Sequence, residues 1–272
     1  LKWLKNFLSN RKAQVIVNGT LSTEYSLTTG VPQGCVLSPI LFNILMADFP
    51  TPDANTKIEL ATFADDIAFF TNSNSTEEAR SHLQKYIYKI EEWAFLWKLK
   101  FSVNKCASMI ITRRRKHIGN LHLTLDATPI DEVERFKFLG ITFNNRLTWT
   151  DHINNVARSV NRSSNIISLL TSKKTCLKFN SLLKIYKALI RSKIDYGAPI
   201  LVSALPSHYK CLDIIQNKIL RKITGAMKST PIALLHLETG TIPIIDRWKY
   251  LASCYQIKLA PKRANPAYAA VR

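Results

Sequence analysis

The chain has 272 residues, of which 46% are hydrophobic, with only 8 glycines and 11 prolines. This composition excludes a disordered or collagen-like protein and allows one large domain or two modest ones. Lysine and arginine number 38 against 19 aspartates and glutamates, and the resulting charge of +19 favours a polyanionic partner, nucleic acid before a membrane surface.

The positive charge is concentrated in the second half of the chain. Residues 1–145 hold 17 basic and 14 acidic side chains, whereas residues 146–272 hold 21 basic and 5 acidic ones. This asymmetry suggests a near-neutral core half followed by a half that grips nucleic acid. A lysine-rich, solvated surface is the alternative explanation.

Cysteine spacing and hydropathy indicate whether to expect a metal site, a membrane span or an oxidising compartment. No apolar run approaches the ~20 residues that span a bilayer, and the opening LKWLKNFLSNRK has no signal-peptide core. The five cysteines stand far apart and form no metal-ligand spacing with the histidines. We therefore expect a soluble, intracellular protein in a reducing compartment, without a zinc site.

The first fifty residues predict a helix, a hairpin and a second helix. Residues 1–10 are typical of a helix end, and a short hairpin is expected around Asn18-Gly19. A glycine-framed loop, GVPQG at 30–34, precedes Ser38-Pro39, which we interpret as a serine cap and a first-turn proline. The following helix is apolar nearly all round and is expected to be buried.

Two adjacent aspartates, Asp65 and Asp66, interrupt the apolar stretch IELATFADDIAFFT at 58–71. A hairpin tip explains one aspartate, because its side chain bonds nearby backbone amides. Two carboxylates among phenylalanines repel each other, and each loses hydration. Both effects lower the stability of the fold unless a cation lies between the carboxylates. A divalent metal removes both penalties and suits phosphoryl transfer, but an ordinary acidic turn remains the alternative.

The rest of the chain divides into a mixed region and a helical region. A capping box at 75–78 starts a helix whose apolar face includes Trp93 and Trp97, and strands are expected at 107–112, 121–125 and 135–143. The first half is thus α+β, with helices on one face of strands. From about residue 148 only helices are expected, and their apolar stripes are Ile153, Val156, Val160 and Ile167; Leu182, Ile185, Leu189 and Ile194; and Leu212, Ile215, Ile219 and Ile223.

In this order the segments resemble the motifs of a reverse transcriptase palm. LTTGVPQGCVLSPILFNILMADFP is similar to motif B, TFADDIAFFT to motif C, WKLKFSVNKCASMIITRRRK to motif D, and RFKFLGITFNNRLTWTDHI to motif E and the entry to the thumb. FADD and FLG followed by LTW resemble in particular the non-long-terminal-repeat (LINE-type, jockey-like) retrotransposon polymerases. The resemblance implies a partial palm, an antiparallel sheet with helices on one face, at residues 1–147, and a basic helical thumb and C-terminal region at 148–272.

The resemblance also implies roles for individual residues. Asp65 and Asp66 would bind the catalytic Mg²⁺, Gln33 and Gly34 would lie against the incoming nucleotide and template, and Lys105 would assist protonation of pyrophosphate. Gly140 would lie in the turn that grips the primer, and Phe63 stands beside the nucleotide site where many relatives carry tyrosine. Gln33 as a plain turn residue and Lys105 as a plain surface lysine are the alternatives.

The implied function is RNA-directed DNA synthesis, with an RNA template, a DNA primer and deoxynucleoside triphosphates as partners, no membrane contact, and action in the nucleus. The basic helices, and Arg113 to Lys116, would contact phosphates without regard to sequence. A non-catalytic nucleic-acid-binding remnant and an RNA-copying polymerase are alternative functions.

The resemblance leaves out one required part of the site, the third metal-binding carboxylate from a strand called motif A. The acidic residues before the hairpin are Glu24, Asp48, Asp53 and Glu59, and none has the context of that strand. We therefore expect the fingers, motif A and any N-terminal endonuclease, encoded in the same polyprotein, to be missing. On this expectation the chain is a fragment or a decayed copy and does not extend a primer by itself.

Overall fold

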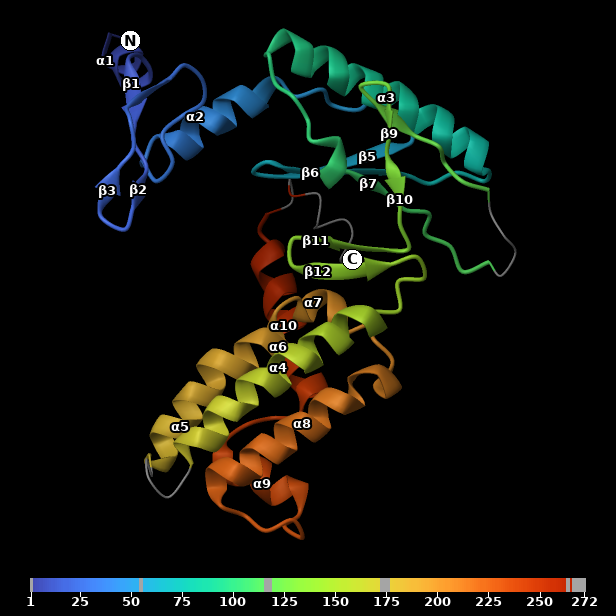
Figure 1. The fold of residues 1–272 in the computed structure, drawn as a ribbon. Coiled ribbons are helices and arrows are strands. Elements are labelled where there is room, and N and C mark those ends of the chain that lie inside the picture. The colour runs from blue at the N-terminus through green and yellow to red at the C-terminus, as the bar shows by residue number, and fades with distance from the viewer. Residues whose placement is uncertain (1, 54–55, 115–118, 172–176, 263–264, 266–272) are drawn as a thin grey trace. The chain divides into compact units, whose positions relative to one another are not determined.

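A computed structural model of the chain describes residues 2–53, 56–114, 119–171, 177–262 and 265. They divide into two compact units, residues 1–108 with 118–132 and residues 109–117 with 133–272. The first unit mixes helices and strands, and the second is a hairpin followed by helices (Figure 1), so the expected α+β class is confirmed at this level. Among the described helices, none has both the length and the apolar character needed to cross a bilayer.

The first unit begins with short elements and contains one long helix. In chain order its elements are α1 (Lys2–Leu8), β1 (Arg11–Ala13), β2 (Ile16–Val17), β3 (Thr20–Leu21), β4 (Tyr25–Leu27), α2 (Ser38–Leu45), the 3-10 turn η1 (Met46–Asp48), β5 (Ile58–Phe63), β6 (Asp66–Thr71), α3 (Thr76–Leu96), the 3-10 turn η2 (Val103–Lys105), β7 (Ala107–Ser108), β8 (Thr124–Leu125), β9 (Thr128–Pro129) and β10 (Asp131–Glu132). These strands pair two by two, antiparallel except for β7 with β10. The expected turn at Asn18-Gly19 is confirmed, with φ of 49° and 83°.

Helix α3 and the β5–β6 hairpin form the core of the first unit (Figure 1). The Ser75 hydroxyl accepts the Glu78 amide at 3.2 Å, which confirms the predicted helix start. Strand alternation turns one face of the hairpin toward α3, where Phe69 packs edge-on against Tyr86. Tyr86 and Trp93 are buried and belong to this core, whereas Trp97, expected on the same apolar face, is 47% exposed.

Helix α2 differs from its expectation in two ways. Leu37 occupies the cap position, and Ser38 is the first helical residue, whose hydroxyl donates to the Pro32 carbonyl. The expected burial is also wrong, since Ile40 and Ile44 are 53% and 65% exposed. The principal neighbour of α2 is the short turn η1, which covers too little surface to bury an all-apolar helix.

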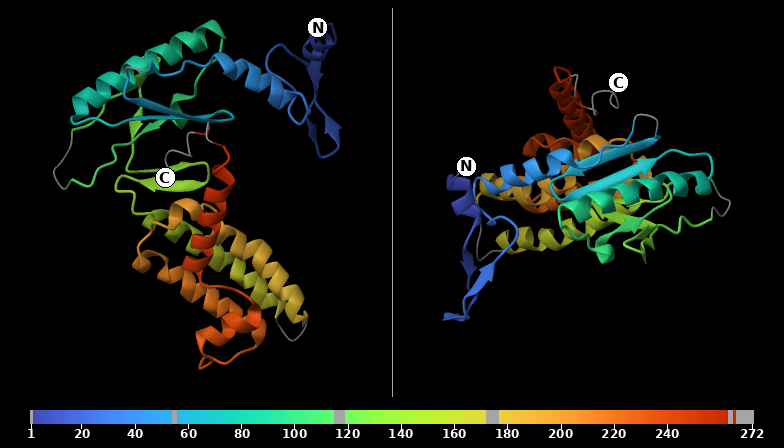
Figure 2. Two further views of the ribbon diagram at one scale, coloured as in Figure 1. Left: turned by 180° about the vertical axis from the view of Figure 1, so that it is seen from behind. Right: turned by 90° about the horizontal axis from the view of Figure 1, so that it is seen from above.

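The second unit is a β-hairpin attached to a helical bundle. Its elements are β11 (Arg135–Phe138), β12 (Ile141–Asn144), α4 (Thr150–Leu170), α5 (Phe179–Tyr186), the π-turn η3 (Lys187–Arg191), α6 (Ser192–Asp195), α7 (Ala198–Leu201), α8 (Pro206–Thr224), α9 (Ile232–Thr239) and α10 (Ile244–Leu259). Helix α4 lies beside both α5 and α8, as Figures 1 and 2 show. The predicted strand over 135–143 is in fact a hairpin with its turn at Leu139-Gly140.

Most of the predicted apolar stripes line the core of this bundle. Ile153, Val160, Leu182, Leu212 and Ile219 are all buried there. The prediction for Leu189 is wrong: it is 42% exposed, whereas the neighbouring Ile190 is fully buried. The π-turn explains the shift, because its extra residue advances the helical phase by about one position.

Candidate active site

Asp65 and Asp66 lie at the tip of the β5–β6 hairpin. Phe63 pairs with Asp66 across the ladder, and Ala64, with a φ of 52°, makes the tight turn between them. Both carboxylates are exposed, and in the described part of the chain no hydrogen bond or ion pair occupies them. The expected loss of hydration at this pair is therefore wrong, and the open oxygens are free to receive a cation.

The alternation of β5 and β6 explains this exposure. Phe63, Asp66 and Phe70 lie on the hairpin face that points away from α3, and both phenylalanines are more than half exposed. Two neighbouring carboxylates with hard oxygen donors fit Mg²⁺, which prefers such ligands and keeps several waters. Among the described residues no group of three or more acidic, histidine or cysteine side chains joins them.

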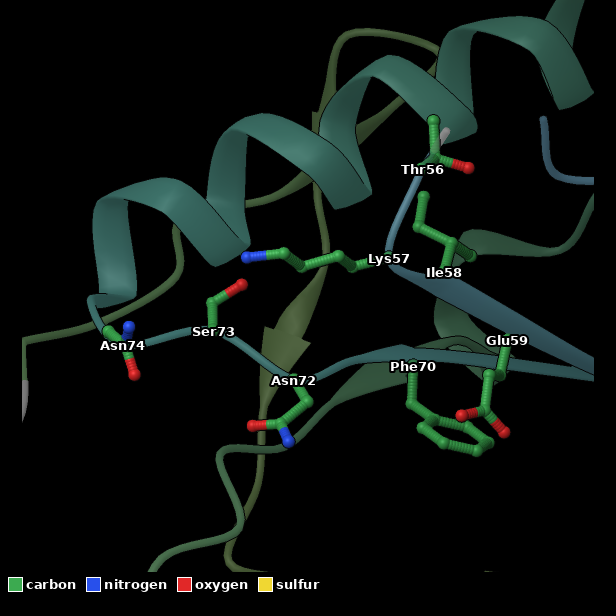
Figure 3. Close-up of a pocket in the computed structure, with 8 residues that line it drawn as sticks. All are labelled: Thr56, Lys57, Ile58, Glu59, Phe70, Asn72, Ser73 and Asn74. Atoms are coloured by element: carbon green, nitrogen blue, oxygen red, sulfur yellow. The ribbon is translucent and has the colours of Figure 1, made fainter. Parts of the chain in front are cut away.

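The acidic residues upstream of the hairpin have other contacts. Asp48 accepts both the Trp93 and the Trp97 indole N–H, at 3.1 and 2.9 Å, and so connects η1 to α3. Asp53 pairs with Lys89 at 2.5 Å, and Glu24 pairs with Lys12 at 2.9 Å. Glu59 is exposed and lies beside Phe70, as Figure 3 shows, several residues along the strand from the tip. None of them provides a third ligand at the tip.

Gln33 and Gly34 lie in an exposed loop whose first part is fixed. The Arg11 guanidinium donates to the carbonyls of Thr29 and Gly30, at 2.9 and 2.7 Å. Gly34 has a φ of 85° with open space where a side chain would begin, so the backbone conformation alone requires glycine there. Within the described residues, no hydrogen bond or ion pair joins this loop to the Asp65–Asp66 tip.

Lys105 ends the 3-10 turn η2 and is exposed. Its backbone amide donates to the Ser102 carbonyl at 2.9 Å, which closes the turn. In the described part of the chain the ammonium group has no bonded partner. This arrangement fits both a mobile proton donor and a plain surface lysine.

Gly140 belongs to the second unit, whereas the other predicted site residues belong to the first. It has a φ of 82°, and a side chain there would meet the Tyr196 ring at 3.0 Å. The Tyr196 hydroxyl donates to the Leu139 carbonyl of the same turn at 2.7 Å. Sequence reasoning missed Tyr196, since no local pattern connects residues that are 57 positions apart.

The basic residues of α8 differ in their exposure and contacts. Lys210, Lys218 and Lys222 are exposed, and Lys222 reaches the Ser168 hydroxyl at 2.5 Å. Arg221 is half-buried and donates to the Thr230 carbonyl at 3.2 Å, so it anchors the loop after α8. Of the run at 113–116, Arg113 and Arg114 are exposed, and the other two residues lie outside the described ones.

A pocket of about 520 Å³ lies where β5 begins and β6 ends (Figure 3). The aspartates are at the other end of this hairpin. The lining of the pocket comes from Thr56 to Glu59 at the start of β5 and from Phe70 and Asn72 to Asn74 after β6. Six-residue strands put this end roughly 15–20 Å from the tip. The pocket is therefore separate from the candidate metal site.

His152 holds the β11–β12 hairpin on the bundle and should make the second unit sensitive to acid. It is buried, and Nδ1 accepts the Thr142 amide at 3.2 Å. Burial, and then the positive charge of Lys137, lower the pKa of His152 below its usual 6.5. As pH falls below 6.5 the unfolded chain takes up a proton that the folded unit resists, so the free energy of unfolding should fall.

The comparison with a glutamine variant tests this expectation. Urea unfolding between pH 7.5 and 5 should show a smaller loss of stability for His152→Gln than for the unaltered chain. His122→Gln, at an exposed position, is the matched control and should keep the original pH profile. Equal pH slopes in all three proteins would contradict a buried neutral imidazole at position 152.

Comparison with known proteins assigns the chain to a family. Residues 1–143 match the family model described as reverse transcriptase (RNA-dependent DNA polymerase). The chain is 30% identical over 98% of its length to a probable RNA-directed DNA polymerase from transposon X-element, and 32% identical over 82% to that from mobile element jockey, both of Drosophila melanogaster. It is also 30% identical over 94% of its length to the probable polymerase from transposon BS.

These alignments cover 29%, 25% and 29% of the relatives' own lengths. No solved structure matches the chain. The matched segment contains the exposed Asp65–Asp66 turn, the Gln33 loop, Lys105 and Gly140. The chain therefore belongs to the reverse transcriptase family.

Proposed function

We propose that this chain is part of an RNA-directed DNA polymerase of a non-long-terminal-repeat retrotransposon. The observation that carries the proposal is the pair of exposed carboxylates on a tight β-turn, within the segment that matches the reverse transcriptase model. The relatives at 30–32% identity are named RNA-directed DNA polymerases of mobile elements, which supports the same activity. The first unit would then be palm, and the helices of the second unit thumb.

In this proposal Asp65 and Asp66 hold Mg²⁺ at the hairpin tip. Bound there, the ion would lower the charge repulsion between the primer hydroxyl and the nucleotide phosphates. The ladder of β5 and β6 positions Asp66, and the two-residue turn positions Asp65 next to it; an in-line displacement requires such positioning. Phe63 presents its ring on the same face as Asp66, where it would limit the space beside the incoming nucleotide.

The remaining predicted residues act as binding and proton-transfer groups in the same proposal. Gln33 and Gly34 would contact the nucleotide and template from the loop that Arg11 anchors at Thr29 and Gly30. The exposed Lys105 would carry a proton to the leaving pyrophosphate. Gly140 would lie against the primer. The excess of basic residues in the second half supports sequence-independent contacts to phosphates, as a polymerase that copies any template needs.

Primer extension by a hybrid polymerase tests the proposal. Residues 1–272 would replace the matching segment of the X-element polymerase, and a DNA primer on an RNA template would be the substrate. We expect Mg²⁺-dependent DNA synthesis by the hybrid and only binding, without extension, by the chain alone.

The same experiment addresses the alternative of a non-catalytic binding remnant, which the basic second half favours. A hybrid that binds primer–template as tightly as its parent and adds no nucleotide would support the remnant. Synthesis of RNA in preference to DNA by the hybrid would point to an RNA-copying polymerase.

A further inference from the structure

We propose that Tyr196 is a positioning residue, which holds the Leu139-Gly140 turn in the shape in which it meets the primer terminus. This inference rests on the proposed function for the primer contact. The contacts that carry it lie wholly within the second unit, between the β11–β12 turn and the corner that joins α6 to α7.

The turn itself has a conformation that needs support. Both of its central residues have positive φ, 46° at Leu139 and 82° at Gly140, and they join Phe138 to its partner Ile141. Two-residue turns of this kind favour asparagine or glycine at both positions, because a larger side chain there is strained. Leucine at the first position is therefore a strained choice, which surrounding contacts must stabilise.

Tyr196 supplies those contacts directly. Its hydroxyl donates to the Leu139 carbonyl at 2.7 Å, and its ring lies over Gly140, where an added Cβ would meet ring atoms at 3.0 to 3.4 Å. The side chain of Tyr196 is nevertheless 55% exposed. Core burial therefore does not explain why a tyrosine stands at this position. Its two contacts with the exposed turn do explain it.

Two further contacts hold β12, the strand that follows the turn. Gly197 follows Tyr196 with a φ of 77°, and an added Cβ would lie 2.8 Å from Cδ1 of the buried Ile141. On the next residue of β12, the Thr142 amide is held by His152 of α4. Because α4 and the α6–α7 corner both contact the hairpin, a movement of the bundle carries the turn with it.

Photo-crosslinking of the full chain to a primer–template tests the proposal. The DNA primer would carry 4-thiothymidine next to its 3′ end on an RNA template, and adducts would be mapped by peptide mass spectrometry. Tyr196→Phe removes only the hydroxyl, so it should lower the adduct yield at the Leu139-Gly140 peptide roughly three- to tenfold, the range expected for one neutral hydrogen bond. Overall duplex affinity should stay unchanged, and the thermal midpoint should fall by no more than about 4 °C, since a single hydrogen bond is lost.

Tyr250→Phe is the matched control, since Tyr250 is equally exposed on α10 and contacts Arg247. It should leave the adduct yield at the turn unchanged. An unaltered yield for Tyr196→Phe, with a clear adduct in the unaltered chain, would overturn the role of Tyr196 and leave the primer contact intact. Absence of any adduct at the turn in the unaltered chain would overturn the primer contact itself and the inference with it.

A double-mutant comparison examines the ring separately from the hydroxyl. Gly140→Ala should lower the thermal midpoint both through its φ and through collision with the Tyr196 ring. In a Tyr196→Ala background only the first penalty remains, so the same substitution should produce a smaller shift. Equal shifts in the two backgrounds would show that the ring does not constrain the turn.

Discussion

Asp65→Asn is expected to reduce nucleotide addition by the hybrid polymerase on the order of 10³-fold or more, because losing metal-based charge stabilisation costs several kcal/mol of barrier height. The substitution keeps the size of the side chain and the exposed turn, so binding of primer–template should persist. Single-turnover extension at saturating nucleotide separates the chemical step from binding.

Asp131→Asn provides the control for that measurement. Asp131 and Glu132 are also adjacent, exposed acids on a strand, and no role is proposed for them. Extension by Asp131→Asn should match that of the unaltered hybrid. Full activity of the Asp65→Asn hybrid would contradict the assignment of the metal site.

The same pair of variants reports on metal binding by the chain alone. Mn²⁺ should broaden the amide NMR signals around Asp65 and Asp66 in the unaltered chain, because a paramagnetic ion relaxes nearby nuclei. The broadening should disappear in Asp65→Asn and persist in Asp131→Asn. Equal broadening at the Asp131-Glu132 pair would mean that the ion only samples exposed carboxylates.

Asp195→Ala is expected to have the largest effect on folding, a loss of about 3–5 kcal/mol in the unfolding free energy of the second unit. Asp195 bonds Arg191 at one oxygen and Arg247 at the other, both at 3.0 Å. The Arg191 side chain is only 9% exposed, so the substitution would leave a charge without its counter-ion inside the bundle. Arg191 also donates to Gln216 and to the Ile242 carbonyl, which prevents it from turning out to water.

Urea unfolding followed through the fluorescence of the buried Trp248 would measure this loss. Glu238→Ala, at an exposed acid on α9, should change the unfolding free energy by less than about 0.5 kcal/mol. A similarly small effect for Asp195→Ala would show that the two guanidinium groups are solvated. Since Asp195 directly precedes Tyr196, the same variant should also lower the crosslink yield at the Leu139-Gly140 turn.

The sequence predicted those parts of the fold that depend on local signals. Ser75 with its capping box, the Asn18-Gly19 turn and the apolar stripe of α8 ending at Gly225 each contain the residues that define the element. The hairpin at Asp65-Asp66 was predicted for the same reason. The order of the motifs can also be read from the sequence. It indicated the reverse transcriptase family, to which the comparison with known proteins assigns the chain.

The missed features depend on packing between distant residues. Burial of Ile40 and Ile44 was predicted from composition, but burial requires a packing neighbour, and the described residues leave both side chains more than half exposed. Hydration of the Asp65-Asp66 pair was misjudged because alternation along β6 turns Phe70 away from the core. The contact of Tyr196 with Gly140 has no local signature at all.

The five-residue π-turn at Lys187–Arg191 fixes the number of residues between Tyr186 and Tyr196 in the second unit. Tyr186 before it bonds Gln216 in the core, and Tyr196 after it bonds the Leu139 carbonyl of the β11–β12 turn. Removing a single residue would restore an ordinary α-helix and rotate everything beyond it by about 100°. Tyr196 would then face another direction, so the interval between these two tyrosines tolerates replacement of residues far better than insertion or deletion.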